Sequence, residues 1–65
     1  IPGAIDREGK IVWIQNEACI NFGKWKGVPL SKVDIGYMQW MMKGTFPTDT
    51  KQIISNAIDG IYPSK

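Results

Sequence analysis

The stretch GKIVWIQNEACINFG, residues 9–23, has two runs of β-branched and aromatic residues on either side of a central Gln-Asn pair. Two such runs around a short turn predict a β-hairpin with strands over about 10–14 and 18–22. Counting outward from the turn pairs Ile14 with Glu17, Trp13 with Ala18, Val12 with Cys19 and Ile11 with Ile20. This register makes one face wholly apolar, whereas a shift by one residue would mix the faces; the apolar face consists of Ile11, Trp13, Ala18, Ile20 and Phe22. The rest of the chain must therefore cover that face.

The segment VPLSKV, residues 28–33, leaves room only for a short third strand at an edge, because Pro29 has no amide hydrogen to donate. The next segment, IGYMQWMMKG, predicts a helix over about 35–43. Asp34 precedes it as an N-cap residue, and Gly44 ends it.

A second helix is predicted over about 47–59. Pro47 suits its first turn, Asp49 complements the positive end of the helix dipole, and Gly60 stops it. Its apolar residues form one stripe at helical spacing; they are Ile53, Ile54, Ala57 and Ile58. The order of elements predicts an α+β domain in which both helices pack on one face of the hairpin.

A chain of 65 residues is long enough for one domain. We expect an irregular lead-in over 1–8 and a single domain over 9–65. Cys19 is the only cysteine, so no internal disulfide can form, which predicts a reducing, cytoplasmic location. No apolar run approaches the ~18 residues of a membrane span. The net charge of +2 does not by itself demand a nucleic-acid partner.

Catalytic residues are not indicated. The six carboxylates are scattered along the chain, and two of them, Asp34 and Asp49, are explained as helix-end residues. Cys19 and Ser31 have no histidine to activate them as nucleophiles. With one cysteine, no histidine and no clustered carboxylates, we expect no metal site and no cofactor. The chain alone is predicted not to be an enzyme.

The stretch GKWKG, residues 23–27, is the first candidate binding site. Lys24 and Lys26 could contact phosphates while Trp25 stacks on a base, as in proteins that bind single strands. The favoured alternative is that Trp25 packs on the core and the lysines are solvated. The remaining lysines considered for the same nucleic-acid surface are Lys10, Lys32 and Lys43.

The stretch YMQWMM, residues 37–42, has more apolar residues than one buried stripe needs. We expect most of them in the core. One surplus side could dock a protein partner, since Met-rich surfaces accept varied partners; its candidate residues are Met38, Trp40 and Met42.

Three ordered motifs, FGKWKGVPL, GYMQWM and FPTDTKQI, resemble the small C-terminal domain of certain bacterial 3′–5′ exonucleases. These enzymes belong to the DEDD superfamily, which includes the epsilon subunit of DNA polymerase III and exonuclease X. The resemblance covers about residues 6–63, and the hairpin segment fits it. The chain departs from it at Gln15-Asn16, where Asn-Gly is more usual, and at Thr50, a position often held by an aliphatic residue.

The resemblance implies a non-catalytic accessory domain that assists DNA or RNA binding for an attached nuclease domain. The catalytic carboxylates and their divalent metals would lie in that other domain. Because the chain starts at Ile1 without methionine, we expect an excised C-terminal domain, monomeric in isolation. The alternatives are a protein-docking module and a free-standing small regulatory protein.

Overall fold

The predicted hairpin is present in the computed structural model, which describes residues 3–64. Strand β1 spans Ile11–Ile14 and strand β2 spans Glu17–Ile20, so both are shorter than predicted. All four predicted pairs are confirmed, from Ile14–Glu17 to Ile11–Ile20. Gln15 and Asn16 have φ values of 52° and 66°, as a type I′ turn requires.

The segment after β2 folds back on it instead of forming a third strand. The amide of Ile20 donates to the carbonyl of Val28, and the amide of Gly27 donates to the carbonyl of Ile20. Pairing is limited to a single bridge between Cys19 and Pro29, and the chain then turns into a short 3-10 helix, η2, at Leu30–Lys32. The third edge strand is therefore reduced to one bridge, because proline offers no further donor to a ladder.

Helix α1 spans Ile35–Lys43, the predicted range. The carboxylate of Asp34 accepts a hydrogen bond from the amide of Tyr37, which confirms the predicted N-cap. Gly44 occupies the C-cap position, and its amide donates to the carbonyls of Trp40 and Met41.

Helix α2 spans Thr48–Ile58, one residue shorter at each end than predicted. Pro47 lies at the N-cap position and not in the first turn, with ψ at 155°, outside the helical region. At the other end the amide of Gly60 donates to Ala57 and the amide of Ile61 donates to Asn56. This pair of bonds is a Schellman motif, which explains why the helix stops before the glycine.

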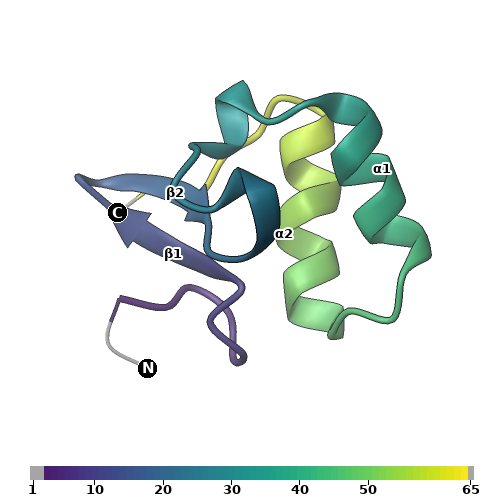
Figure 1. Ribbon diagram of the computed structural model, residues 1–65, viewed down its shortest axis with the longest axis horizontal. Helices are drawn as coiled ribbons and strands as arrows, with labels where there is room; N and C mark the ends of the chain where they lie inside the picture. The colour runs from purple at the N-terminus through teal and green to yellow at the C-terminus, as the bar shows by residue number, and fades with distance from the viewer. Residues whose placement is uncertain (1–2, 65) are drawn as a thin grey trace.

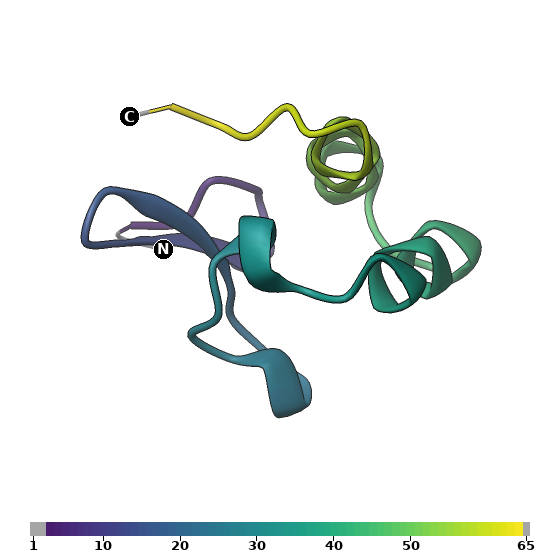
Figure 2. The same cartoon turned by 90° about the horizontal axis from the view of Figure 1, so that it is seen from above.

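The two helices pack against each other as an antiparallel pair beside the hairpin (Figure 1). Seen from above, η2 lies between the hairpin and the helices, and the C-terminal tail runs from the end of α2 back toward the hairpin (Figure 2). One hydrophobic core joins all parts; its buried residues are Ile11, Ala18, Ile20, Leu30, Val33, Met38, Met41, Ile54 and Ala57. The predicted α+β architecture, a β-hairpin followed by two helices that share one core with it, is confirmed.

The lead-in segment is held more firmly than an irregular terminus. Ala4 forms a bridge with Val12, and the amide of Ile5 donates to the carbonyl of Ile11. Asp6 is only 5% exposed, and one of its oxygens accepts from the amide of Ile11 while the other accepts from the hydroxyl of Thr50. Positions 1–2 and 65 of the predicted segments lie outside the described residues.

Thr50 is fully buried, at 0% exposure. Its hydroxyl needs a partner there, and the Asp6 carboxylate supplies it. A contact with the lead-in thus satisfies the polar group of this buried residue.

Within residues 3–64 no helix has the length and apolar character needed to cross a bilayer.

Candidate nucleic-acid interface

Five aromatic rings from three separate segments lie in contact on one part of the molecule. Phe22, Tyr37, Trp40 and Phe46 form a closed circuit with neighbouring ring centroids 5.4–6.5 Å apart. Trp25 joins it through Tyr37, at a centroid distance of 5.8 Å. All five pairs are tilted or edge-to-face, the arrangements that aromatic rings prefer. We call these five rings the aromatic cluster.

Local structure explains how the rings meet. Phe22 follows β2, and the 3-10 helix η1 at Gly23–Trp25 places Trp25 beside α1. This tight loop needs Gly23 and Gly27 in the left-handed region, with φ of 66° and 86°. Phe46 comes from the short connection between the helices and reaches back to Phe22.

The cluster is partly open to solvent. Trp40 is 56% exposed, whereas the other four rings are half-buried and pack against the core. The indole nitrogen Nε1 of Trp25 is buried and has no hydrogen-bond partner among residues 3–64. The indole of Trp25 therefore points its polar edge into the molecule, as the core-packing alternative predicts.

Two lysines stand over the rings. The ammonium of Lys10 lies 5.1 Å from the centroid of Phe22, and that of Lys24 lies 5.6 Å from the centroid of Trp25. Both distances are within the range of cation–π contacts. Of the other candidate lysines, Lys26 and Lys32 are exposed at the ends of the two 3-10 helices. Lys43 is exposed in the last turn of α1, three residues after Trp40.

The three candidate docking residues are separated by their burial. Met38 is 2% exposed and lies in the core, so no partner could contact it without unfolding the domain. Met42 is half-buried, and only Trp40 is open to solvent. Met38 therefore does not belong to the docking patch predicted on α1, because it packs in the core with residues of α2 and the hairpin.

Sequence reasoning did not find the roles of Phe22, Tyr37 and Phe46 in a shared cluster. Their aromatic character was the available signal, but nothing local indicates that Phe22 meets Tyr37 and Phe46, which follow it by 15 and 24 residues. The structure brings Lys10 and Lys24 to the cluster, whereas Lys32 lies at the end of η2, a segment that contributes no ring to the cluster.

Metal-binding groups and reactive thiols are two kinds of site that can be checked directly among the described residues. No three His, Cys, Asp or Glu side chains of residues 3–64 are grouped to hold a metal ion. Cys19 is buried, and burial, assisted by the negative charge of Glu17, raises the pKa of its thiol. A buried thiol with a raised pKa is a poor nucleophile.

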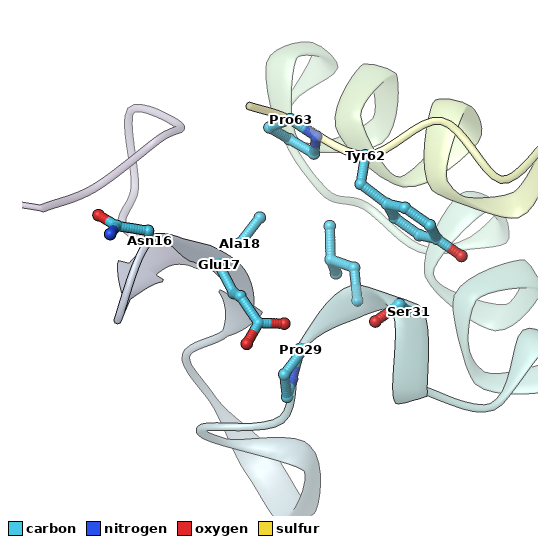
Figure 3. Close-up of a pocket in the computed structure, with 8 residues that line it drawn as sticks. Asn16, Glu17, Ala18, Pro29, Ser31, Tyr62 and Pro63 are labelled. Atoms are coloured by element: carbon cyan, nitrogen blue, oxygen red, sulfur yellow. The ribbon is translucent and has the colours of Figure 1, made fainter. Parts of the chain in front are cut away.

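A pocket of about 130 Å³ lies where the C-terminal tail passes the end of the hairpin. Figure 3 shows Tyr62 and Pro63 on one side of it, with Glu17 and Ala18 opposite. It is smaller than the ~300 Å³ at which pockets for small molecules begin. We therefore do not assign it a ligand.

A wider depression of about 510 Å³ lies at the start of α2, between Arg7 and Gln52. Its carboxylate, Asp49, already accepts hydrogen bonds from the amides of Arg7 and Thr50, and the bond from Arg7 is the main cause that lowers the pKa of Asp49. The negative charge at this helix end also disfavours an anion. These groups serve to tie the lead-in to α2.

Comparison with protein-family models, with curated proteins and with solved structures finds no match to this chain.

Proposed function

We propose that this domain is a non-catalytic accessory module of a 3′–5′ exonuclease that binds nucleic acid across the aromatic cluster. The observation that supports it best is the contact of two ammonium groups with partly exposed rings, Lys10 on Phe22 and Lys24 on Trp25. Rings offer flat surfaces to bases, and ammonium groups offer charge to phosphates, so the pairing of both suits a nucleic-acid strand. The motif resemblance to exonuclease C-terminal domains supports the same role.

Lysine–phosphate contacts would supply most of the affinity. Lys24 and Lys10 flank the cluster, and Lys26 and Lys43 extend the positive charge along η1 and α1. Such binding is expected to weaken as salt rises, because each neutralised phosphate releases counterions. The attached nuclease domain would hold the metals and cleave the strand. A reducing cytoplasmic location fits the single, buried thiol.

The test is a titration of the 65-residue chain with labelled oligothymidine at several salt concentrations. The double variant Lys24→Ala/Lys26→Ala should bind more weakly, with a salt slope smaller by up to ~0.7 for each lost phosphate contact. Lys51→Ala, a lysine variant on α2 outside the candidate set, is the matched control and should bind as the wild type does. The same titration followed by NMR supplies the refuting result: if oligothymidine changes no amide chemical shift of the wild type at low salt, the proposal is refuted.

A docking role for the domain is supported by two exposed apolar residues of α1, Ile35 at 51% and Trp40 at 56%. Mixing the domain with the nuclease domain of its parent protein should then perturb the amide signals around Ile35. Unchanged spectra at high concentrations of both domains would exclude this second role.

A further inference from the structure

We propose that Trp40 is the residue of the cluster that stacks on an unpaired base, so that the surface prefers single-stranded over double-stranded nucleic acid. This inference rests on the proposed function, and it moves the stacking role from Trp25 to Trp40. The sequence pattern indicates Trp40 only as a candidate for protein docking.

Exposure separates Trp40 from the other rings. At 56% exposed it is the most open aromatic side chain of the cluster, and its neighbours are all half-buried. A fully packed tryptophan buries most of its large surface. The core of this domain covers less than half of the Trp40 side chain, so much of its apolar ring stays in contact with water. A base stacked on it would remove that surface from water.

Two neighbours hold the ring of Trp40 in place. The ring centroid of Tyr37, one turn earlier in α1, lies 5.4 Å from that of Trp40, with an interplanar angle of 31°. The ring of Phe46 meets Trp40 edge-on, with a centroid distance of 6.0 Å and an interplanar angle of 73°. The contacts come from two different segments, so they restrict the ring in more than one direction. A ring already oriented loses less conformational entropy when a ligand binds.

Trp25 is poorly placed for the same task. It is half-buried against Tyr37, and the ammonium of Lys24 stands over its ring. Its Nε1 is buried, so the edge of the indole that carries this atom faces the interior and only part of the ring is open to a base. The role left for Trp25 is to support Tyr37, which in turn supports Trp40.

Lysines accompany the network of rings that includes Trp40. Lys24 stands over Trp25, whose ring contacts Tyr37, and Lys10 stands over Phe22, whose ring contacts Phe46; Tyr37 and Phe46 are the two rings that contact Trp40. Lys43 lies three residues further along the helix, on a neighbouring position of its surface. A strand whose phosphates meet these lysines could turn a base onto Trp40. In a duplex the bases are stacked on each other and their faces are closed to the ring.

The experiment measures fluorescence anisotropy with labelled oligothymidine and with the same strand paired to oligoadenosine. Trp40→Ala should bind the single strand about tenfold more weakly or worse, whereas its salt slope should stay that of the wild type. Trp40→Phe should keep part of the affinity because a smaller ring remains. Duplex binding should be unchanged by either substitution.

Ile61→Ala is the matched control. Ile61 is an apolar residue that is 61% exposed, about as open to solvent as Trp40, and it lies in the C-terminal tail after α2, outside the aromatic cluster. It should bind both probes as the wild type does. Thermal unfolding of each variant confirms that the fold is kept, as expected for exposed positions.

The outcomes separate the two proposals. If Trp40→Ala binds the single strand as tightly as the wild type while Lys24→Ala binds it more weakly, stacking on Trp40 is overturned and the proposed function stands. Equal loss on single strand and duplex also overturns it. If the wild type binds neither probe at low salt, the proposed function fails and the inference with it; association with a protein through Trp40 under those conditions would identify a docking surface instead.

Discussion

Replacing Thr50 by valine tests whether the buried bond to Asp6 stabilises the fold. Valine has the β-branched shape of threonine but no hydroxyl, so the change keeps the shape of the side chain and removes its hydrogen bond. Thr50 is 0% exposed and Asp6 is 5% exposed, so water cannot replace the lost donor without rearrangement. The Asp6 oxygen that accepts from Thr50 would be left buried and unpaired.

The expected cost follows from these facts. A hydrogen bond to a charged group contributes ~1.5–3 kcal/mol to stability, and leaving a buried acceptor without a partner costs a similar free energy. We expect Thr50→Val to lower the free energy of unfolding by about 2 kcal/mol. A 65-residue domain has a total stability of roughly 3–10 kcal/mol. The loss would lower the unfolding midpoint by about 8–16 °C.

Urea unfolding followed by tryptophan fluorescence measures the change, with circular dichroism as a second probe of two-state behaviour. Thr45→Val is the matched control, because Thr45 is exposed in the connection between the helices. A double-mutant cycle with Asp6→Ala isolates the pair, and Thr50→Val should cost little once the carboxylate is gone. If Thr50→Val costs no more than Thr45→Val, the bond contributes nothing and the reasoning is refuted.

Three further predictions concern the turn, the start of α2 and the thiol. Because Asn16 has φ at 66°, Asn16→Val should destabilise the hairpin by ~1–2 kcal/mol in urea unfolding whereas Asn16→Gly should not; equal stability of the two variants would contradict this. The lowered pKa of Asp49 means that the stability it contributes is present above its ordinary pKa and is lost as pH falls through its folded pKa. The amide signal of Arg7 should therefore titrate with a midpoint below the ordinary aspartate pKa of ~3.9, and a midpoint at or above that value would argue against the bond. Burial and the charge of Glu17 raise the pKa of the Cys19 thiol, so the unfolded chain loses the thiol proton at a lower pH than the folded chain does, and the free energy of unfolding should fall as pH rises above ~8.5. Ellman's reagent should also modify the native thiol more slowly than the thiol in urea, and equal rates would refute its burial.

The candidate site was predictable only in part. Lys24 was identified from its place between glycines, and the structure does put its ammonium on an aromatic ring. Which of the apolar residues of α1 remain exposed could not be read from the sequence, because Met38 and Trp40 are both apolar and differ only in what covers them. The core takes Met38, while Trp40 is left 56% exposed.

The sequence alone determined the local structure of this protein. The hairpin register, the Asp34 cap and the stop before Gly60 each depend on atoms within a few residues of one another. At such separations few conformations compete, so residue type and spacing are enough to select one.

Only the tertiary structure decided the contacts between distant segments. Asp6 meets Thr50 across 44 residues, and the aromatic cluster joins the end of the hairpin, α1 and the connection that follows it. Many pairings of apolar or polar residues are compatible with the same local pattern, and close packing of one small core selects among them. The most exposed ring of the cluster, and with it the candidate binding surface, is therefore a consequence of how the core was filled.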